Sequence, residues 1–175
     1  SKIIDPEFDI SNENFPFMAC KEISVCGGVV ARLFRISFSG ELAYELSFPT
    51  QYALSFVNYL MEIGKEENII PYGTEALGVM RIEKGHAAGA ELNGTTTALN
   101  LNMGKMVSDN KDSIGSVLSK REGLNQSDDL KLVGIKPINS SDQLISGSHL
   151  FDLSSKVNPQ NDLGYITSSC FSPTL

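Results

Sequence analysis

The stretch that most constrains the fold is Arg32–Phe48, in which apolar and polar residues alternate on both sides of a glycine. The apolar residues that recur at every second position are Phe34, Ile36 and Phe38 before the glycine and Leu42, Tyr44, Leu46 and Phe48 after it. A period of two is typical of strands with one buried and one solvent-facing side. Between the two arms stands Ser39-Gly40-Glu41, and glycine reaches the backbone angles that a turn requires. The stretch therefore predicts two antiparallel strands joined by a turn, with these apolar residues on the buried side.

The solvent-facing side of the second arm carries one carboxylate, Glu45, between the small residues Ala43 and Ser47. This arrangement leaves room for a flat ligand whose polar edge lies against the carboxylate. An ionised carboxylate accepts two parallel hydrogen bonds, so it matches a planar group that offers two adjacent N–H donors. A glutamate on the open side of a strand is also commonly a solvated charge. From this pattern alone, both interpretations of Glu45 stay open.

The surrounding sequence predicts an α+β fold. Strands are expected at about 21–27 and 28–38, before the second arm of the hairpin. Apolar residues at helical spacing predict a helix over about 50–64 that packs on the sheet. A second helix is expected from Thr74 to Gly85, and its wide apolar arc predicts that it is largely buried. The expected result is an antiparallel sheet with two packed helices.

The C-terminal third predicts a second unit. Residues 118–129 are charged and loop-like, which places a domain boundary there and gives domains of 1–117 and 118–175. Short strand candidates follow, with glycine and asparagine-proline turns between them, at 130–138, 144–145, 148–151 and 163–167. Short strands at such intervals are typical of a small antiparallel β-barrel or sandwich, and a small β-barrel is the expected fold of this unit. The long loop at 86–110 is expected to be functional or packed on a partner.

Composition and motifs exclude several classes of function. A net charge of −7 disfavours a nucleic-acid partner, because phosphate binding needs clustered lysine and arginine. No apolar run reaches the length of a membrane span, and no membrane partner is expected. The three cysteines lack C-x-x-C spacing, which favours ordinary thiols in a reducing cytoplasm over a zinc site. His86 and His149 are isolated, so the sequence predicts neither a metal site nor a catalytic constellation.

Three motifs carry a resemblance to a known family. Residues 35–46 resemble the R-x-x-[YF]-[TS]-G-E-x-x-[YF]-E-[IL] signature of the folate-binding aminomethyltransferases, the glycine-cleavage T-protein family. Residues 71–85 resemble the helix that follows in that family, and residues 164–175 are similar to its G-x-[IV]-T-S-x-x-x-S-P-[TS]-L motif. The order and spacing of these motifs cover almost the whole chain. The resemblance implies the folate-binding fold of this family, incomplete at its N-terminal side, followed by a truncated barrel.

One branch of the family is formed by the alpha subunits of heterotetrameric sarcosine oxidases. The chain resembles the C-terminal part of such a subunit, on the evidence of Pro71-Tyr72-Gly73-Thr74-Glu75-Ala76. Stand-alone T-proteins carry R-D-x-L-R-L-E-A-G there, and their first arginine aligns with Leu77. The implied function is tetrahydrofolate binding in support of 5,10-methylenetetrahydrofolate formation from the methyl carbon of sarcosine. A glycine-cleavage aminomethyltransferase and a non-catalytic folate-binding or assembly module are the alternatives.

The resemblance also implies roles for single residues. Glu45 falls on the carboxylate that holds the pterin ring, and Phe38 takes the place of a tyrosine and offers an apolar wall. Arg81 is a further candidate contact, with a paired arginine at the core edge as the alternative. No catalytic residue is expected in this chain, because the family's catalytic aspartate lies upstream. FAD, FMN and NAD are expected elsewhere in the parent complex, with other sarcosine oxidase subunits as partners, and the chain alone is expected to be inactive.

Overall fold

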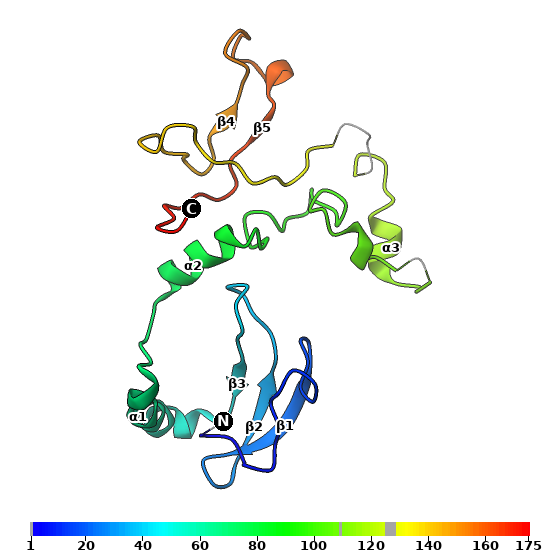
Figure 1. Cartoon of the computed structure of the whole chain (residues 1–175). Helices are drawn as coiled ribbons and strands as arrows, with labels where there is room; N and C mark the ends of the chain where they lie inside the picture. The colour runs from blue at the N-terminus through cyan, green and yellow to red at the C-terminus, as the bar shows by residue number, and fades with distance from the viewer. Residues whose placement is uncertain (1, 109, 125–128) are drawn as a thin grey trace. The chain divides into compact units, whose positions relative to one another are not determined.

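The computed structural model describes residues 2–108, 110–124 and 129–175. The chain forms two compact units, Ser1–Lys84 and Gly85–Leu175. The first unit holds a three-stranded antiparallel sheet in the order β1-β2-β3 (Figure 1). Its strands are β1 (Cys20–Val25), β2 (Val29–Phe34) and β3 (Glu45–Ser47). The predicted mixture of helices and antiparallel sheets is thus confirmed. The domain boundary at 117/118 stays a prediction. Residues 125–128 of the expected linker lie outside the described residues.

The register of β2 and β3 corrects the predicted hairpin. Leu33 pairs with Leu46 and Phe34 pairs with Glu45, and the ladder ends there. Leu33 is only 2% exposed, so its neighbour Phe34 must point to the opposite side of the strand. The alternation predicts Phe34 on the buried side. This prediction is wrong, because the residues of β2 that face the core are Ala31 and Leu33. Residues 35–44 form a longer connection between the strands than the predicted turn.

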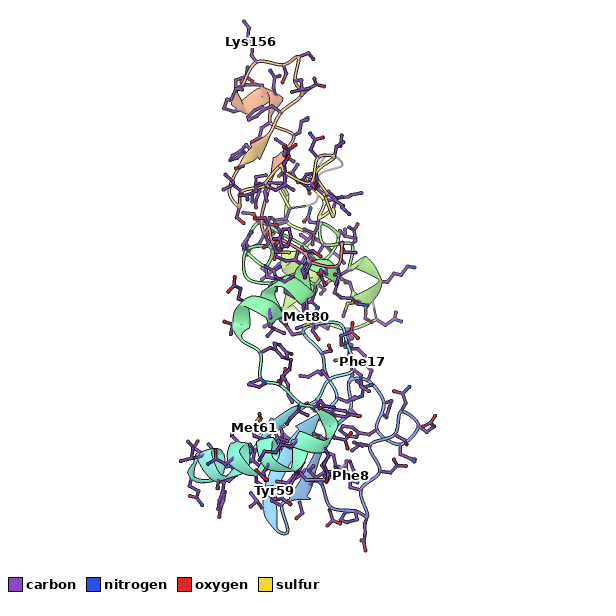
Figure 2. The ribbon with its side chains drawn as sticks, turned by 60° about the vertical axis from the view of Figure 1, so that its left-hand side comes forward. Phe8, Phe17, Tyr59, Met61, Met80 and Lys156 are labelled. Carbon is purple, nitrogen blue, oxygen red and sulfur yellow. The ribbon has the colours of Figure 1, made fainter. Side chains whose placement is uncertain are left out.

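The core of the first unit lies on one side of the sheet. Its buried members are Phe15, Ile23, Val25, Ala31 and Leu33. The N-terminal segment supplies Phe15 and also Phe8, whose ring (Figure 2) meets that of Phe15 edge-on with centroids 5.4 Å apart. Tyr44 stacks on Phe15 from the connection before β3, at 6.5 Å. The segment before β1 therefore completes the hydrophobic core.

A helical segment follows the sheet in the chain. It consists of a 3₁₀ turn (Thr50–Tyr52), α1 (Ala53–Ile63) and a second 3₁₀ turn (Gly64–Glu67). The Phe56 ring of α1 packs on that of Phe48 just after β3, with centroids 4.4 Å apart. The predicted helix over 50–64 is therefore present, and its Phe56 packs against the hydrophobic core.

The second predicted helix is α2, over Thr74–Glu83. The expectation that it is largely buried is wrong, because none of its residues is buried and Leu77 to Glu83 are half-buried. Its apolar arc is broad, but sequence periodicity reports only which residues share a face. Whether that face is buried depends on whether another segment of protein packs against it.

The tip of the 35–44 connection lies against the end of α2. A Cβ atom built on Gly40 would stand 2.5 Å from Cγ of Lys84, and Gly40 has a φ of +85°. We expect Gly40→Ala to lower the free energy of unfolding by about 1–2 kcal/mol, because alanine is strained at this φ and Lys84 must move. Urea unfolding of the purified chain measures it. Gly78→Ala, inside α2 with open space at its Cβ, is the matched control and should be stabilising by about 0.5–1 kcal/mol. Equal effects of the two substitutions would contradict the close approach.

The described residues of the second unit include a short antiparallel ladder, formed by β4 (His149–Leu150) and β5 (Gly164–Tyr165). Its helical turns are a 3₁₀ turn (Gly104–Met106), α3 (Ile114–Leu118) and a 3₁₀ turn (Pro159–Asn161). The predicted strand at 130–138 is extended chain without a ladder. The predicted barrel is thus represented, among the residues that the structure describes, by this ladder alone, and a closed barrel is not shown.

Asparagine side chains hold the extended chain of the second unit in place. Asn100 Nδ2 donates to the Leu130 carbonyl at 3.0 Å, and Asn102 Nδ2 donates to the Leu132 carbonyl at 2.8 Å. The Leu132 N–H donates in turn to the Asn100 carbonyl at 2.7 Å. These bonds satisfy backbone groups that a regular sheet would otherwise pair. They attach the 86–110 loop to the segment that begins at residue 130.

The β4–β5 ladder carries a histidine–aspartate pair. His149 Nδ1 lies 2.6 Å from Asp162 Oδ2, and the Gly164 N–H donates to Asp162 Oδ1 at 3.0 Å. The Gly164 bond, and after it the His149 ring, hold the pKa of Asp162 below its usual range against partial loss of solvation. The pair fixes the turn that leads into β5.

Candidate functional site

Glu45 begins β3 and is exposed. Its neighbour Leu46 packs toward the core with Leu33, so the Glu45 side chain lies on the open side of the sheet. Within the part of the chain that the structure describes, no hydrogen bond or ion pair engages the Glu45 carboxylate. The predicted open-side position is therefore found, and the carboxylate can accept hydrogen bonds from a ligand.

Phe38 and Arg81 lie on two segments that meet. Phe38 is in the 35–44 connection and is 37% exposed. Arg81 is half-buried in the last turn of α2. The contact between Gly40 and Lys84 brings the tip of this connection to the end of α2. Glu45 is joined to neither Phe38 nor Arg81 by any described hydrogen bond or ion pair, so their shared role remains a prediction.

Arg35 anchors the start of the connection. Its guanidinium lies over the Tyr44 ring, 5.1 Å from the centroid, where a cation–π contact is favourable. Its backbone N–H donates to the Ala19 carbonyl at 2.9 Å, and its carbonyl accepts from the Met18 N–H at 2.9 Å. These bonds prolong the β1–β2 pairing beyond the strand ends. Arg35 thus supports the approach to Glu45 and lies on the scaffold.

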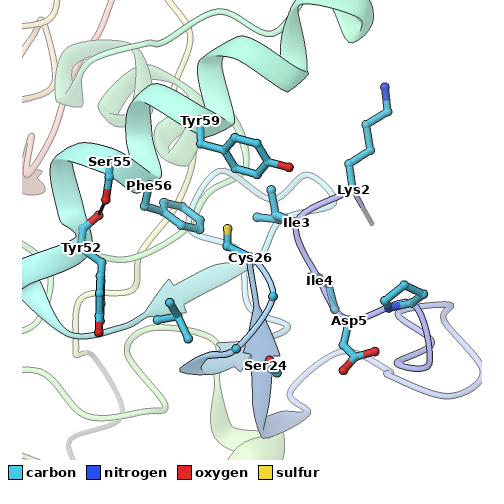
Figure 3. A pocket seen from close by; sticks show the side chains of 14 residues that line it. Lys2, Ile3, Ile4, Asp5, Ser24, Cys26, Tyr52, Ser55, Phe56 and Tyr59 are labelled. Carbon is cyan, nitrogen blue, oxygen red and sulfur yellow. Dashed lines mark hydrogen bonds between the residues drawn. The ribbon is translucent and has the colours of Figure 1, made fainter.

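A hollow of about 850 Å³ opens elsewhere in the first unit, between α1, the N-terminal segment and the β1–β2 turn (Figure 3). Its walls include Ile3 and Cys26 and an aromatic series on the helical segment, Tyr52, Phe56 and Tyr59. A second hollow, of about 530 Å³, lies in the second unit between residues 93–98, 106–108 and 111–124. Glu45, Phe38 and Arg81 line neither of these hollows. The helical spacing of the aromatic series could have indicated in the sequence that these three rings share one face of the helical segment, but not that a hollow lies beside them.

The structure also shows a buried carboxylate that the sequence did not single out. Glu91, in the 86–110 loop, is 3% exposed. Its Oε2 accepts from the Ala88 N–H at 2.8 Å, and its Oε1 accepts from the Ser168 hydroxyl at 2.5 Å. Such bonds offset the cost of burying a charged group. Glu91 therefore links the loop to the C-terminal segment 164–175 inside the second unit.

In residues 2–108, 110–124 and 129–175, no three histidine, cysteine, aspartate or glutamate side chains converge as metal ligands would. In the same ranges, no helix combines the length and apolar character that a bilayer crossing needs.

Comparison with known proteins identifies relatives. Residues 2–111 match the model of the GCVT N-terminal domain. The sarcosine oxidase subunit alpha of Rhizobium meliloti (strain 1021) is 48% identical over 174 residues, which is 98% of this chain and 17% of the relative. The subunit of the same name from Corynebacterium sp. (strain U-96) is 38% identical, over 95% of this chain and 18% of the relative. Human mitochondrial dimethylglycine dehydrogenase is 33% identical over 65% of this chain and 13% of its own length.

The chain thus spans less than a fifth of the length of these relatives. The domain match covers more than half of the chain and includes β1 to α2 together with the loop that carries Glu91. These matches agree with the motifs at residues 35–46 and 71–85. The chain therefore belongs to the family of the GCVT N-terminal domain.

Proposed function

We propose that this chain is the tetrahydrofolate-binding portion of a sarcosine oxidase alpha subunit. The observation that carries the proposal is the Glu45 carboxylate, which lies on the open side of the sheet without a described partner. The similarity to subunits named sarcosine oxidase alpha supports the choice of branch. In the whole enzyme, the methyl carbon of sarcosine would be transferred to tetrahydrofolate to give 5,10-methylenetetrahydrofolate.

The role of this chain in that reaction is to bind and orient. Glu45 would accept two parallel hydrogen bonds from the donor edge of the pterin, a geometry that a carboxylate satisfies with both oxygens. Phe38 would supply an apolar wall, and Arg81 is a further candidate contact. Tetrahydrofolate supplies the nucleophilic nitrogens that take up the one-carbon unit.

The remaining machinery is proposed to lie outside this chain. Oxidation of the amine would take place with FAD, FMN and NAD held elsewhere in the complex, and the other sarcosine oxidase subunits are the proposed partners. The names of the relatives, which are subunits of an oxidase, support such an assembly. The proposed compartment is the cytoplasm, and the chain by itself is proposed to form no methylenetetrahydrofolate.

The proposal is tested by titration calorimetry with 5-formyltetrahydrofolate, a stable analogue that retains the pterin ring. Glu45→Gln is expected to weaken binding by about 10- to 100-fold, because one charged acceptor is replaced by an amide with a mismatched donor. Glu22→Gln is the matched control, since Glu22 is an exposed glutamate of β1 on the same side of the sheet. Its affinity should stay within twofold of the wild type.

Two results would contradict the proposal. Equal affinities of the wild type and Glu45→Gln would remove Glu45 from the binding site. Absence of binding to the wild-type chain, both alone and within the longer subunit, would remove folate as the ligand.

A further inference from the structure

An aromatic ring stands directly beside Glu45 on the open side of the sheet. Phe34 of β2 is the antiparallel partner of Glu45, and opposed residues in such a ladder have Cβ atoms about 4.5–5.5 Å apart on the same face. The adjacent pair, Leu33 and Leu46, packs on the core. The side chains of Phe34 and Glu45 therefore project together to the other side.

The surroundings single out Phe34 on this face. The next row of the sheet consists of Glu22, Arg32 and Ser47, which are all exposed and polar. Among the described strand residues on the open side, Phe34 is the aromatic one, and it is only half-buried. The face thus offers one flat apolar surface with a carboxylate at its edge and charged or polar side chains beyond it.

This pairing has a defined chemical preference. A planar heterocycle can lie against an aromatic face while its N–H edge reaches a neighbouring carboxylate. An aliphatic cation would use the carboxylate but gain little from the flat ring. A ring without donors would use Phe34 but leave the carboxylate without a partner.

We propose that Phe34 is a positioning and specificity-determining residue that stacks on the flat ring whose donor edge is bound by Glu45. This inference rests on the proposed folate function and adds to it a contact that the family motif does not contain, since Phe34 precedes the motif's first residue, Arg35. Phe34 holds the ring in the plane in which both carboxylate oxygens meet donors. It selects pterin-like heterocycles over other ligands with N–H groups.

The test compares two probes by calorimetry, 5-formyltetrahydrofolate and p-aminobenzoylglutamate, which lacks the pterin. Phe34→Leu is expected to bind 5-formyltetrahydrofolate 3- to 10-fold more weakly than the wild type, because the aromatic contact is lost. Its affinity for p-aminobenzoylglutamate should stay unchanged. Phe34→Tyr keeps an aromatic ring and should bind 5-formyltetrahydrofolate with an affinity within twofold of the wild type. Phe17→Leu, at an exposed phenylalanine of the same unit, should leave the affinities for both probes unchanged.

If the role of Phe34 were merely structural, Phe34→Leu would bind both probes more weakly and would have a shifted unfolding midpoint. This result would overturn the inference. If Glu45→Gln weakens pterin binding and Phe34→Leu does not, the positioning role of Phe34 is overturned and the folate function stands. If the wild type does not bind 5-formyltetrahydrofolate, the folate function fails and the role of Phe34 fails with it.

Discussion

Phe15→Ala is expected to lower the free energy of unfolding by about 3 kcal/mol, the low end of the range for emptying a buried phenylalanine site. Phe15 is 3% exposed, and its ring contacts those of Phe8 and Tyr44. Removing the ring leaves a cavity between the N-terminal segment and the sheet. Urea unfolding of the purified chain, followed by circular dichroism, measures the change.

The chain offers a matched control two residues further on. Phe17 lies in the same segment (Figure 2) but is 61% exposed, so Phe17→Ala should change stability by less than about 0.5 kcal/mol. Where Phe15→Ala is too unstable to purify, Phe15→Leu gives a smaller cavity and should still be clearly destabilised relative to Phe17→Leu. Similar effects at positions 15 and 17 would show that the N-terminal segment does not complete the core.

Glu91→Ala is expected to lower the free energy of unfolding by about 2–3 kcal/mol. The substitution removes the acceptor of the Ala88 N–H and of the Ser168 hydroxyl, and bonds to a buried charged acceptor contribute about 1.5–3 kcal/mol. The Ala88 amide should also lose protection in hydrogen exchange, because its acceptor is gone. Thermal unfolding and hydrogen exchange of the same samples test both expectations.

The control for Glu91 is Glu122→Ala, because Glu122 is exposed in the same unit and should be close to neutral. A double-mutant cycle with Ser168→Ala isolates the bond between the loop and the C-terminal segment. The two substitutions should be non-additive by about 1 kcal/mol, as expected for residues in direct contact. Strict additivity would contradict a direct Glu91–Ser168 bond.

The position of Glu45 shows what the local sequence pattern alone can predict. The alternation around residues 42–48 was sufficient to place Glu45 on the open side, because successive side chains of a strand point to opposite faces. The helices over residues 53–63 and 74–83 also followed from spacing. These features depend on residues close together in the chain, and the sequence displays such relations directly.

Phe34 shows where the same reasoning fails. Leu33, Phe34 and Ile36 are all apolar, so the sequence allowed either phase of the alternation on β2. The choice depended on which residue meets the core built by Phe15 and Val25. Only the packed structure could place Phe34 beside Glu45 instead of beneath the sheet.

The sequence by itself determined the approximate positions of the strands and helices of the first unit, the open-side position of Glu45 and the family motifs. The tertiary structure decided the half-buried state of α2, the approach of Gly40 to Lys84 and the burial of Glu91. The physical reason is that burial is set by contacts between residues far apart in the chain. Glu91 and Ser168 are 77 positions apart, and no local periodicity relates two residues at that separation.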